Sequence, residues 1–344
     1  MPIELTIENC AAYLGSRGET FSAPPQIREL GGGVSNRVLL VEASEKRFIL
    51  KQSLGRLRVA DDWQADRSRI FREVSALRDA ARFFPAGSAP EVLWVDEENF
   101  LFAMTAADAG AQSWKTHLLS GRIDPGVAAT AGVLLGLWIR NSWRDSKLER
   151  IYGDQTAFYQ LRIDPYYRTA ARRHPELAGR AEELIAASAQ RRVCLVHGDW
   201  SPKNLIVGPE AVMVIDFEVT HFGDPAFDVA FCINHFLLKC FRCSDRVPQL
   251  LDLSRTFYTW VAGVVPAPAL EFLEAAAARH LGWLMLARVD GKSPVEYIRE
   301  EPLRDAVRRA ALEIILEGPT NLQTCYAIVK TELRRLEEVP VKAQ

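Results

Sequence analysis

The sequence has little of what marks several large classes of protein. Its 344 residues include only six cysteines, and their scattered positions do not resemble the disulfide framework of a secreted domain. Cys240 and Cys243 form a Cys-x-x-Cys after an apolar run, but without a second pair this spacing fits one helix face better than a zinc or redox site. Most of the cysteines are therefore expected to be buried thiols.

A strong net charge is also missing. Lysine and arginine number 42 and aspartate and glutamate 44, so the whole molecule has no field that indicates a nucleic acid or an acidic membrane surface as partner. No stretch reaches the roughly 20 apolar residues that a membrane helix needs, and residues 1–5 lack the basic start of a signal peptide. We expect a cytoplasmic protein that binds neither nucleic acid nor membrane.

What the sequence does have is enough apolar residues for a large core. They make up 48% of the chain, and the length indicates two domains or lobes. Before residue 105 the patterns are mainly those of short strands bounded by glycine and polar turns. The predicted helices cover 6–14 and 63–83, and the predicted strands cover 27–30, 38–42, 47–51, 91–95 and 100–104.

After residue 105 the apolar spacing becomes helical and stays so, apart from three short apolar runs. The predicted helices include 127–139, 181–190, 267–287 and 302–316, and the predicted strands are 193–196, 205–207 and 212–217. The resulting fold class is α+β. It has a strand-rich lobe over residues 1–105 and a larger, mainly helical lobe over residues 106–344.

We expect three oxygen-bearing side chains to come together around the short strands of the second lobe. Asp199 and Asn204 share one loop between two strands, and Asp216 ends the next strand. Phosphoryl transfer needs a carboxylate to accept the attacking hydroxyl's proton and oxygen ligands for Mg²⁺. We assign Asp199 as the base and Asn204 and Asp216 as metal ligands. Glu218, two residues further on the same predicted strand face, is a further metal candidate.

The same residues have a less specific interpretation. A His-Gly-Asp loop can be a capped turn, and a short glycine run can be an ordinary flexible turn. Phosphate binding becomes the better interpretation because a lysine ends the third strand, where it can reach phosphates under the glycine run and pair with a glutamate on the next helix. The residues assigned to the nucleotide in this way are Gly31, Gly32, Gly33, Ser35, Lys51 and Glu73.

In this order the motifs resemble the aminoglycoside phosphotransferase and choline kinase-like group, which shares the protein-kinase fold. His197-Gly198-Asp199 with Asn204 resembles its catalytic loop, and Ile215-Asp216-Phe217-Glu218 resembles its metal-binding strand. The resemblance implies a two-lobed protein-kinase-like fold that uses ATP or GTP with Mg²⁺. It also implies that a linker starting at Met104 binds adenine through its backbone, and that His197 and Asp228 support the loop.

The catalytic loop departs from this family at one position. Two residues after the catalytic aspartate, protein kinases have lysine and aminoglycoside kinases often have histidine, whereas this chain has Ser201. We expect Lys203 to take over the contact with the phosphates. The small lobe is similar to methylthioribose kinases in the segments 28–31, 50–54 and 66–73, which favours a sugar as the phosphate acceptor.

The acceptor site is the least specific part of the prediction. Arginine and lysine outnumber acidic residues between Arg140 and Arg192, which favours a neutral or anionic acceptor over a polycationic aminoglycoside. A charged stretch that interrupts the helices at 287–294 is either a solvent turn or part of the acceptor site. The candidates are Arg288 and Lys292, with Asn234 and His235 as weaker ones, since a histidine on an apolar helix is more often a core residue.

We therefore expect an ATP-dependent phosphotransferase that acts on a hydroxyl of a small molecule, such as a methylthioribose-like pentose. The alternatives are an aminoglycoside- or choline-type kinase and a nucleotide-binding regulator that transfers no phosphate. A protein kinase is disfavoured because the segment between Asp216 and Asp228 is too short for the usual activation loop. The sequence does not indicate the oligomeric state or the choice between ATP and GTP.

Overall fold

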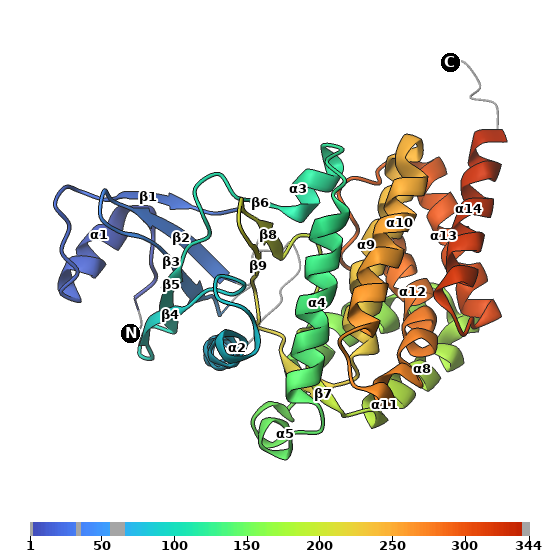
Figure 1. Ribbon diagram of the computed structural model, residues 1–344, viewed down its shortest axis with the longest axis horizontal. Helices are drawn as coiled ribbons and strands as arrows, with labels where there is room; N and C mark the ends of the chain where they lie inside the picture. Colours follow the sequence, from blue (N-terminus) through green and yellow to red (C-terminus); the bar gives the residue numbers. More distant parts are fainter. Residues whose placement is uncertain (1–2, 32–35, 56–65, 339–344) are drawn as a thin grey trace. The chain divides into compact units, whose positions relative to one another are not determined.

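The computed structural model describes residues 3–31, 36–55 and 66–338, and the chain divides into two compact units (Figure 1). The first unit runs to Ala111 and also includes Gly208–Glu218, whereas the second comprises Gln112–Val207 and the chain from Val219 onward. The division expected from the sequence, at residue 105, keeps Gly208–Glu218 with the helical part of the chain.

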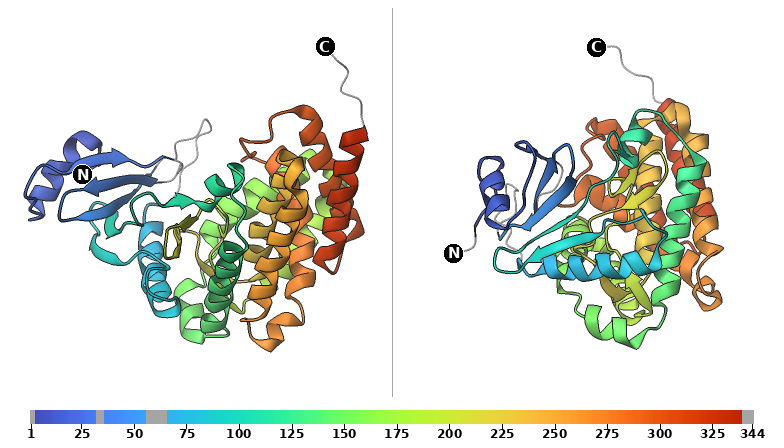
Figure 2. Two further views of the ribbon diagram at one scale, coloured as in Figure 1. Left: turned by 45° about the horizontal axis from the view of Figure 1, so that its top comes forward. Right: turned by 60° about the vertical axis from the view of Figure 1, so that its left-hand side comes forward.

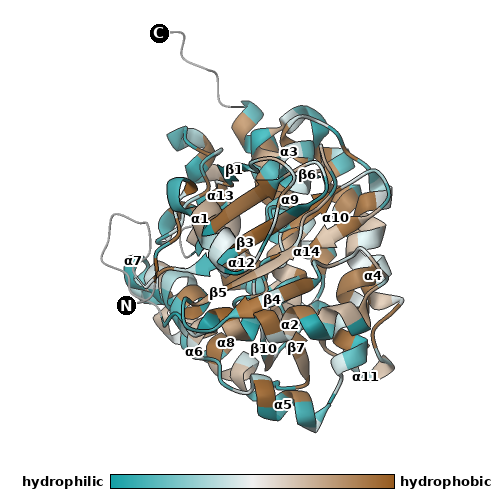
Figure 3. Ribbon diagram, turned by 90° about the vertical axis from the view of Figure 1, so that its left-hand side faces the viewer, coloured by the Kyte–Doolittle hydropathy of each residue, from teal (hydrophilic) through white to brown (hydrophobic). Residues whose placement is uncertain are grey.

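The first unit is built on a five-stranded antiparallel sheet with the order β1-β2-β3-β5-β4. In Figure 3, coloured by hydropathy, apolar stretches lie along several of these strands. The strands are β1 (Gln26–Glu29), β2 (Asn36–Glu42), β3 (Arg47–Ser53), β4 (Val92–Asp96) and β5 (Leu101–Thr105). The short strand β9 (Val212–Val214) also belongs to this unit.

Two helices of this unit bury their apolar faces. Helix α1 (Ile7–Ser16) starts with a capping box, in which Thr6 and Asn9 each bind the other's backbone N–H. Its Leu14 packs with Leu39 and Leu50 in one apolar core. Helix α2 (Arg69–Phe83) buries Ile70, Val74 and Leu77 at helical spacing, as the sequence predicts.

Strand β3 carries residues of different character on its two faces. Phe48 and Leu50 belong to the core under α1. Because side chains alternate along a strand, Lys51 points to the opposite face. The neighbouring strands hold β3 in register, with Lys51 opposite Val38 on β2 and Phe102 on β5. The sheet therefore fixes the backbone of Lys51 from both sides.

The second unit is mainly helical (Figure 2). Helix α4 packs against α10, α9 lies against both α10 and α12, and α12 lies against α13. The α-helices are α3 (Trp114–Leu119), α4 (Pro125–Ser142), α5 (Ser146–Tyr152), α6 (Thr156–Phe158), α7 (Thr169–Arg173), α8 (Ala178–Gln190), α9 (Ala226–Arg242), α10 (Val247–Ala262), α11 (Ala267–Leu270), α12 (Leu273–Asp290), α13 (Glu301–Glu317) and α14 (Leu322–Glu338).

A π-helix and a few short strands complete the second unit. The π-helix η1 (Tyr159–Arg168) joins α6 to α7, and two single 3₁₀ turns, η2 (Pro175–Leu177) and η3 (Ser244–Arg246), lie further along. Strand β7 (Cys194–Val196) pairs with β10 (His221–Gly223), and β6 (Gln112–Ser113) pairs with β8 (Leu205–Val207). The α+β prediction is thus confirmed, with a strand-rich antiparallel part and a mostly helical remainder.

Four predicted element boundaries are wrong, and local contacts account for most of the differences. The helix predicted over 63–83 begins at Arg69, because Asp66 accepts the backbone N–H of Ser68 in a turn. The helix predicted over 267–287 is interrupted between Leu270 and Leu273, where the Phe272 ring stacks on Trp143.

The strand predicted over 212–217 ends at Val214, since Asp216 has a φ of +70°, which no strand residue adopts. The stretch 287–294, expected to interrupt the helices, remains helical to Asp290. Within the described ranges, no helix combines the length and the apolar character needed to cross a bilayer.

Candidate active site

Lys51 lies at the centre of a buried ion-pair cluster in the first unit. Its Nζ donates to Glu73 Oε1 and to Asp216 Oδ1, each at 2.7 Å. Glu73 is only 1% exposed and Lys51 only 4%. The ion pair between Lys51 and Glu73 that the sequence predicts is therefore present, and Asp216 is a second carboxylate on the same ammonium group.

The charges of this cluster keep Lys51 protonated. Burial lowers the pKa of Lys51, but the negative charges of Asp216, Glu73 and Glu218 outweigh it, so the net shift is upward. Burial raises the pKa of Glu73 by more than the charge of Lys51 lowers it. Glu73 is thus a weaker anion than an exposed glutamate, whereas Lys51 is a fixed positive charge that can bind phosphate oxygens.

Glu218 has partners that the sequence does not predict. Its Oε2 accepts hydrogen bonds from Asn36 Nδ2 at 2.8 Å and from Arg69 Nε at 3.3 Å. The argument that Glu218 shares a strand face with Asp216 is wrong, because β9 ends before either residue. In this structure Glu218 is held by an amide and a guanidinium group.

The predicted catalytic loop connects β7 to β8 in the second unit. Asp228, which is completely buried, accepts the backbone N–H of His197 at 2.6 Å and of Gly198 at 2.9 Å. His197 Nδ1 in turn accepts the backbone N–H of Asp199 at 3.2 Å. The start of the loop is therefore held by two side chains, His197 and Asp228, that the sequence proposes as supports.

Gly198 is required by the path of this loop. Its φ is +78°, and a Cβ at this position would lie 2.9 Å from Val219 Cγ1 and 3.1 Å from the Val219 carbonyl oxygen. A residue with a side chain would be strained in this backbone conformation and would also contact Val219 too closely. The glycine thus lets the chain turn tightly before Asp199.

Asp199 has two cationic partners. Arg162 Nη2 lies 3.1 Å and Lys203 Nζ 3.2 Å from the same carboxylate oxygen, Oδ2. Arg162 also donates from Nε to the carbonyl of Gly198 at 2.6 Å, so one guanidinium binds both the carboxylate and the loop backbone. Lys203, expected at the nucleotide phosphates, is bound to Asp199 in this structure. Its side chain is 47% exposed.

Arg162 is the main site residue that sequence reasoning missed. It lies on the π-helix η1, far from the catalytic loop in sequence, and η1 contains Pro165. π-helical turns occur often at functional sites, but they cannot be recognised from apolar spacing. No signal in the sequence therefore pointed to Arg162.

The side chain of Asn204 is oriented by the loop itself. Its Nδ2 donates to the Asp199 carbonyl at 3.0 Å, and no hydrogen bond to its Oδ1 occurs among the described residues. An amide oxygen of this kind is a hard donor that suits Mg²⁺. Asp216 supplies a carboxylate whose side chain is 24% exposed, so both proposed ligands fit this ion chemically.

The remaining nucleotide candidates are only partly described. Gly32, Gly33 and Ser35 lie outside the described residues. Gly31 follows β1, and a Cβ at this position would meet no heavy atom of the described residues within 4 Å. Met104 lies in β5, where it is opposite Ile49, and Ser201 is buried in the catalytic loop.

The four acceptor candidates have different surroundings. Arg288 binds Tyr166 OH at 3.0 Å, and Lys292 Nζ lies 3.4 Å from Asp164 at the surface. Asn234 is completely buried, and neither of its amide atoms has a partner among the described residues. His235 packs edge-on against Phe231, and burial, followed by the charge of Arg288, lowers its pKa well below the usual value.

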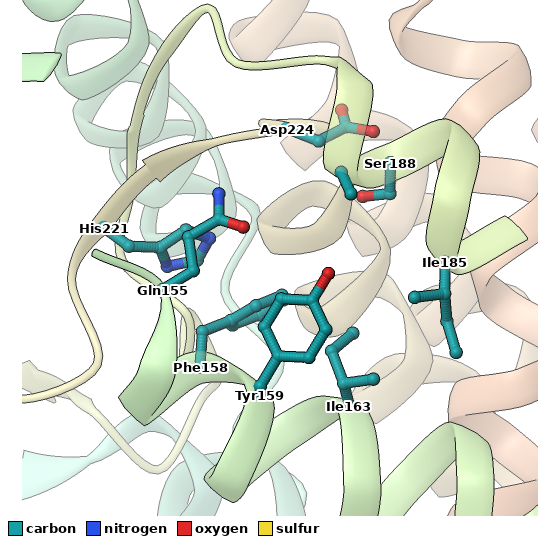
Figure 4. Close-up of a pocket in the computed structure, with 9 residues that line it drawn as sticks. Gln155, Phe158, Tyr159, Ile163, Ile185, Ser188, His221 and Asp224 are labelled. Carbon is teal, nitrogen blue, oxygen red and sulfur yellow. The ribbon is translucent and has the colours of Figure 1, made fainter. Parts of the chain in front are cut away.

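A separate small pocket lies elsewhere in the second unit (Figure 4). Phe158, Tyr159, Ile163 and His221 are among its lining residues. Asp224 also lines it; burial raises the pKa of this carboxyl, and Arg191 forms an ion pair with it. None of the residues predicted for the active site lines this pocket, so we assign it no part in the chemistry.

The sequence of the chain resembles those of known proteins. The model of the phosphotransferase enzyme family matches residues 26–239, a range that includes Lys51 and the whole catalytic loop. Methylthioribose kinase 2 of Oryza sativa subsp. japonica is 24% identical over 279 residues, which cover 73% of this chain and 64% of the rice protein.

Methylthioribose kinase of Escherichia coli O45:K1 is 27% identical over 271 residues, which cover 69% of this chain and 64% of that protein. The chain thus matches less than two thirds of the length of these curated relatives.

A solved structure confirms the fold. The ADP-bound aminoglycoside phosphotransferase APH(2'')-Ib matches with a TM-score of 0.51 and 16% identity, over 93% of this chain and 98% of that one. At this identity the likeness concerns the fold alone. The kinase-like fold and the family resemblance that the sequence motifs predict are both confirmed.

Proposed function

Because the chain belongs to the phosphotransferase enzyme family, we propose that it transfers the γ-phosphoryl group of ATP to a hydroxyl of a small molecule. The observation that carries this proposal is the set of contacts around Asp199. A carboxylate held by Arg162 and Lys203, on a loop fixed by Asp228, is suited to accept a proton from a positioned hydroxyl.

In the proposed reaction, Asp199 takes the proton of the acceptor hydroxyl as its oxygen attacks the γ-phosphorus. The bond from this phosphorus to the β-γ bridging oxygen breaks, and ADP leaves with the electron pair. Arg162 orients the base through Oδ2 and holds the adjacent backbone through Gly198. Positioning of this kind is the main contribution that a protein makes to phosphoryl transfer.

We assign the nucleotide phosphates to Lys51, oriented by Glu73. In the proposed complex the ammonium group exchanges its contact with Asp216 for phosphate oxygens, which frees that carboxylate. The glycine run Gly31–Gly33, Ser35 and the backbone at Met104 stay part of this proposal, as does the use of ATP rather than GTP.

Asp216 and Asn204 are the residues that we propose as Mg²⁺ ligands, each through an oxygen. The ion, when bound, would neutralise negative charge that develops on the phosphate oxygens. Glu218 is already bound by Arg69 and Asn36, so we assign it to the support of this region and not to the metal.

A methylthioribose-like pentose is the first acceptor to test. The curated relatives named methylthioribose kinases support this choice, as do the small-lobe motifs. Acceptors of the aminoglycoside or choline type are the alternative within the same reaction class. A regulator that binds nucleotide without transferring phosphate is the alternative outside it.

The test is ADP release with Mg-ATP across a panel of pentoses, methylthioribose, choline and aminoglycosides. We expect acceptor-dependent ADP release by the wild-type protein and its loss in Asp216→Ala, with the fold retained by circular dichroism. A regulator would instead give a thermal shift with Mg-ATP and no ADP with any acceptor. Undiminished turnover in Asp216→Ala would contradict the assignment of this residue.

A further inference from the structure

A buried lysine in the second unit has no carboxylate partner among the described residues. Lys239 on α9 is completely buried. Its Nζ donates to the carbonyl of His235 at 3.1 Å and lies 5.1 Å from the centre of the Tyr297 ring. Glu296, a carboxylate whose charge acts on it, forms its ion pair with Lys115 instead. A buried charge without a counterion is costly, so this position needs an explanation.

Arg288 is a second, half-buried cation on α12, the helix that packs against α9 (Figure 1). Its Nη1 donates to Tyr166 OH at 3.0 Å and to the carbonyl of Ser293 at 2.7 Å. Its Nε is buried and has no hydrogen-bond partner among the described residues. Arg288 therefore keeps part of its donor capacity unused and, within the described ranges, lacks a carboxylate.

The acidic residues nearby already have cationic partners. Glu296 is bound by Lys115. Asp199 is bound by Arg162 and Lys203, as described above. At the surface, Asp164 is shared by Arg172 and Lys292. The local excess of positive charge around Lys239 and Arg288 is therefore not neutralised by the described residues.

Unpaired polar atoms occur in the same region. The Tyr297 hydroxyl, whose ring faces Lys239, is buried without a hydrogen-bond partner among the described residues. The amide of Asn234, on the same helix as Lys239, is also buried and unpaired within the described ranges. Buried polar groups are nearly always satisfied, so the unpaired Tyr297 hydroxyl beside Lys239 is a group that a ligand or an ordered water would satisfy.

Aromatic rings connect this region to the catalytic loop. The guanidinium of Arg162, which binds Asp199, lies 5.9 Å from the centre of the Tyr166 ring, and that of Arg288 lies 5.5 Å from it. Phe231 lies 5.8 Å from Tyr166, and His235 lies 5.4 Å from Phe231, between centroids. The base and the two cations are thus parts of one contiguous cluster within the second unit.

We propose that the phosphate acceptor carries, besides its reacting hydroxyl, an anionic group, a carboxylate or a phosphate ester, which Lys239 and Arg288 bind. This inference rests on the proposed function, because it concerns the acceptor of that reaction. Within that reaction class it favours hydroxylated acids and phosphorylated sugars over their neutral counterparts, and methylthioribose serves as the neutral reference in the test. Sequence reasoning named Arg288 but missed Lys239, which follows an apolar run and resembles an ordinary helix end.

The charge of Lys239 is expected to depend on whether an anionic ligand is bound. Burial, followed by the positive charge of Lys115, lowers the pKa of Lys239 to about 7. The cost of the buried ammonium group is therefore reduced in the free protein by partial loss of its proton. A bound carboxylate or phosphate would favour the charged form, because an opposite charge stabilises it.

The test uses matched acceptor pairs that differ in charge. The pairs are ribose and ribose 5-phosphate, glucose and gluconate, and glycerol and glycerate, with methylthioribose as a further neutral arm and choline as a cationic arm. ADP release gives kcat/KM for each. We expect the anionic member of at least one pair to exceed its neutral partner by about 10-fold or more. Preference for the neutral or cationic compounds throughout would overturn the inference.

Two substitutions test the residues. Lys239→Met and Arg288→Met should each raise KM for the anionic acceptor by about 10- to 100-fold, with little change in KM for ATP. Lys147→Met, an exposed lysine on α5, is the control and should change neither. If Lys239 served only the fold, Lys239→Met would lower Tm and leave the preference for anionic acceptors intact. Our account predicts instead that Lys239→Met does not lower Tm and that it reduces the preference for anionic acceptors.

A binding measurement separates this inference from the proposed function. Ribose 5-phosphate and gluconate, at constant ionic strength, should raise the Tm of the wild-type protein. They should raise the Tm of both variants by less. No shift in the wild type, or equal shifts in the variants, would overturn the anion site whether or not ADP is released. Intact anion binding with no turnover on any acceptor would instead count against the proposed phosphotransfer and support the site.

Discussion

Arg162 Nη2 lies 3.1 Å from Asp199 Oδ2, and Nε of the same guanidinium lies 2.6 Å from the carbonyl oxygen of Gly198. One side chain from the π-helix thus holds both the proposed base and the loop that carries it. The guanidinium is planar, so these two contacts fix the direction of the carboxylate. This relationship gives Arg162 a positioning role that can be measured apart from nucleotide binding.

We predict that Arg162→Met lowers kcat by about 10- to 100-fold while KM for ATP changes little, because the base loses its orientation but Lys51 is untouched. Steady-state ADP release measures both constants. Arg150→Met, an exposed arginine at the end of α5, is the matched control and should behave as the wild type. A normal kcat in Arg162→Met would show that the contact has no part in turnover.

For the buried pair of Lys51 and Glu73, we predict that stability and nucleotide binding can be changed separately. Lys51→Met leaves Glu73 as an unpaired buried carboxylate, which should destabilise the protein by about 3–5 kcal/mol. Adding Glu73→Leu should restore most of that stability, but neither variant should show a thermal shift with Mg-ATP.

The control for this pair is Lys46→Met, which removes a half-exposed lysine that is paired with Glu19 in the same unit. Its effect on stability should stay below about 1 kcal/mol, because surface ion pairs contribute little. Urea unfolding and thermal shifts measure all three variants. A nucleotide shift of normal size in Lys51→Met would contradict the assignment of Lys51 to the phosphates.

Gly198→Ala should distort the catalytic loop. The positive φ and the close approach to Val219 predict a loss of about 1–3 kcal/mol in unfolding free energy, together with a lower kcat. Gly179→Ala on α8 is the control, since no heavy atom of the described residues would lie within 4 Å of its Cβ and alanine favours helix. If both variants unfold and turn over alike, the loop does not depend on this glycine.

Lys239 predicts a pH dependence of stability. Its pKa is lowered from 10.5 to about 7 by burial, so between about pH 7 and 10 the unfolded chain binds a proton that the folded protein does not. The free energy of unfolding of the wild type therefore rises with pH across this window, by about 1–4 kcal/mol compared with that of Lys239→Met. The titratable groups that act on Lys239 include Lys115, Cys232, Glu296 and Cys243, and His235 and Tyr297 also face it.

Urea unfolding of the wild type and Lys239→Met at about pH 6, 8 and 9.5 measures this difference. Below about pH 7 both states hold the proton, so the difference between the two proteins should be constant there. Parallel stability profiles over the whole range would mean that Lys239 has an ordinary pKa in the folded protein.

The sequence predicted those parts of the site that follow from local spacing. Alternation along β3 turns Lys51 away from the core under α1, and helical spacing places Glu73 within its reach. The hydrogen bonds from His197 and Gly198 to Asp228 also occur where the motif suggested. In these cases the strand period, the helix period or a short motif determines which groups meet.

The parts that were missed depend on tertiary structure. Arg162 reaches Asp199 only because a π-helix places it there, and Lys239 is buried only because residues from other segments, such as Tyr297, cover it. The prediction that Glu218 shares a strand face with Asp216 assumes that the chain stays extended through Asp216. The φ of Asp216 is +70°, so the strand alternation does not continue to Glu218. Periodicity carries no information on such contacts.

The central claim, that Asp199 is the base of an acceptor-dependent phosphotransfer, is tested most directly by Asp199→Asn. Asparagine keeps the shape of the side chain but cannot take up a proton at pH 7. We predict that this variant keeps the thermal shift with Mg-ATP and loses acceptor-dependent ADP release by about 10²- to 10⁴-fold. Turnover equal to that of the wild type, with the same acceptor, would contradict the account.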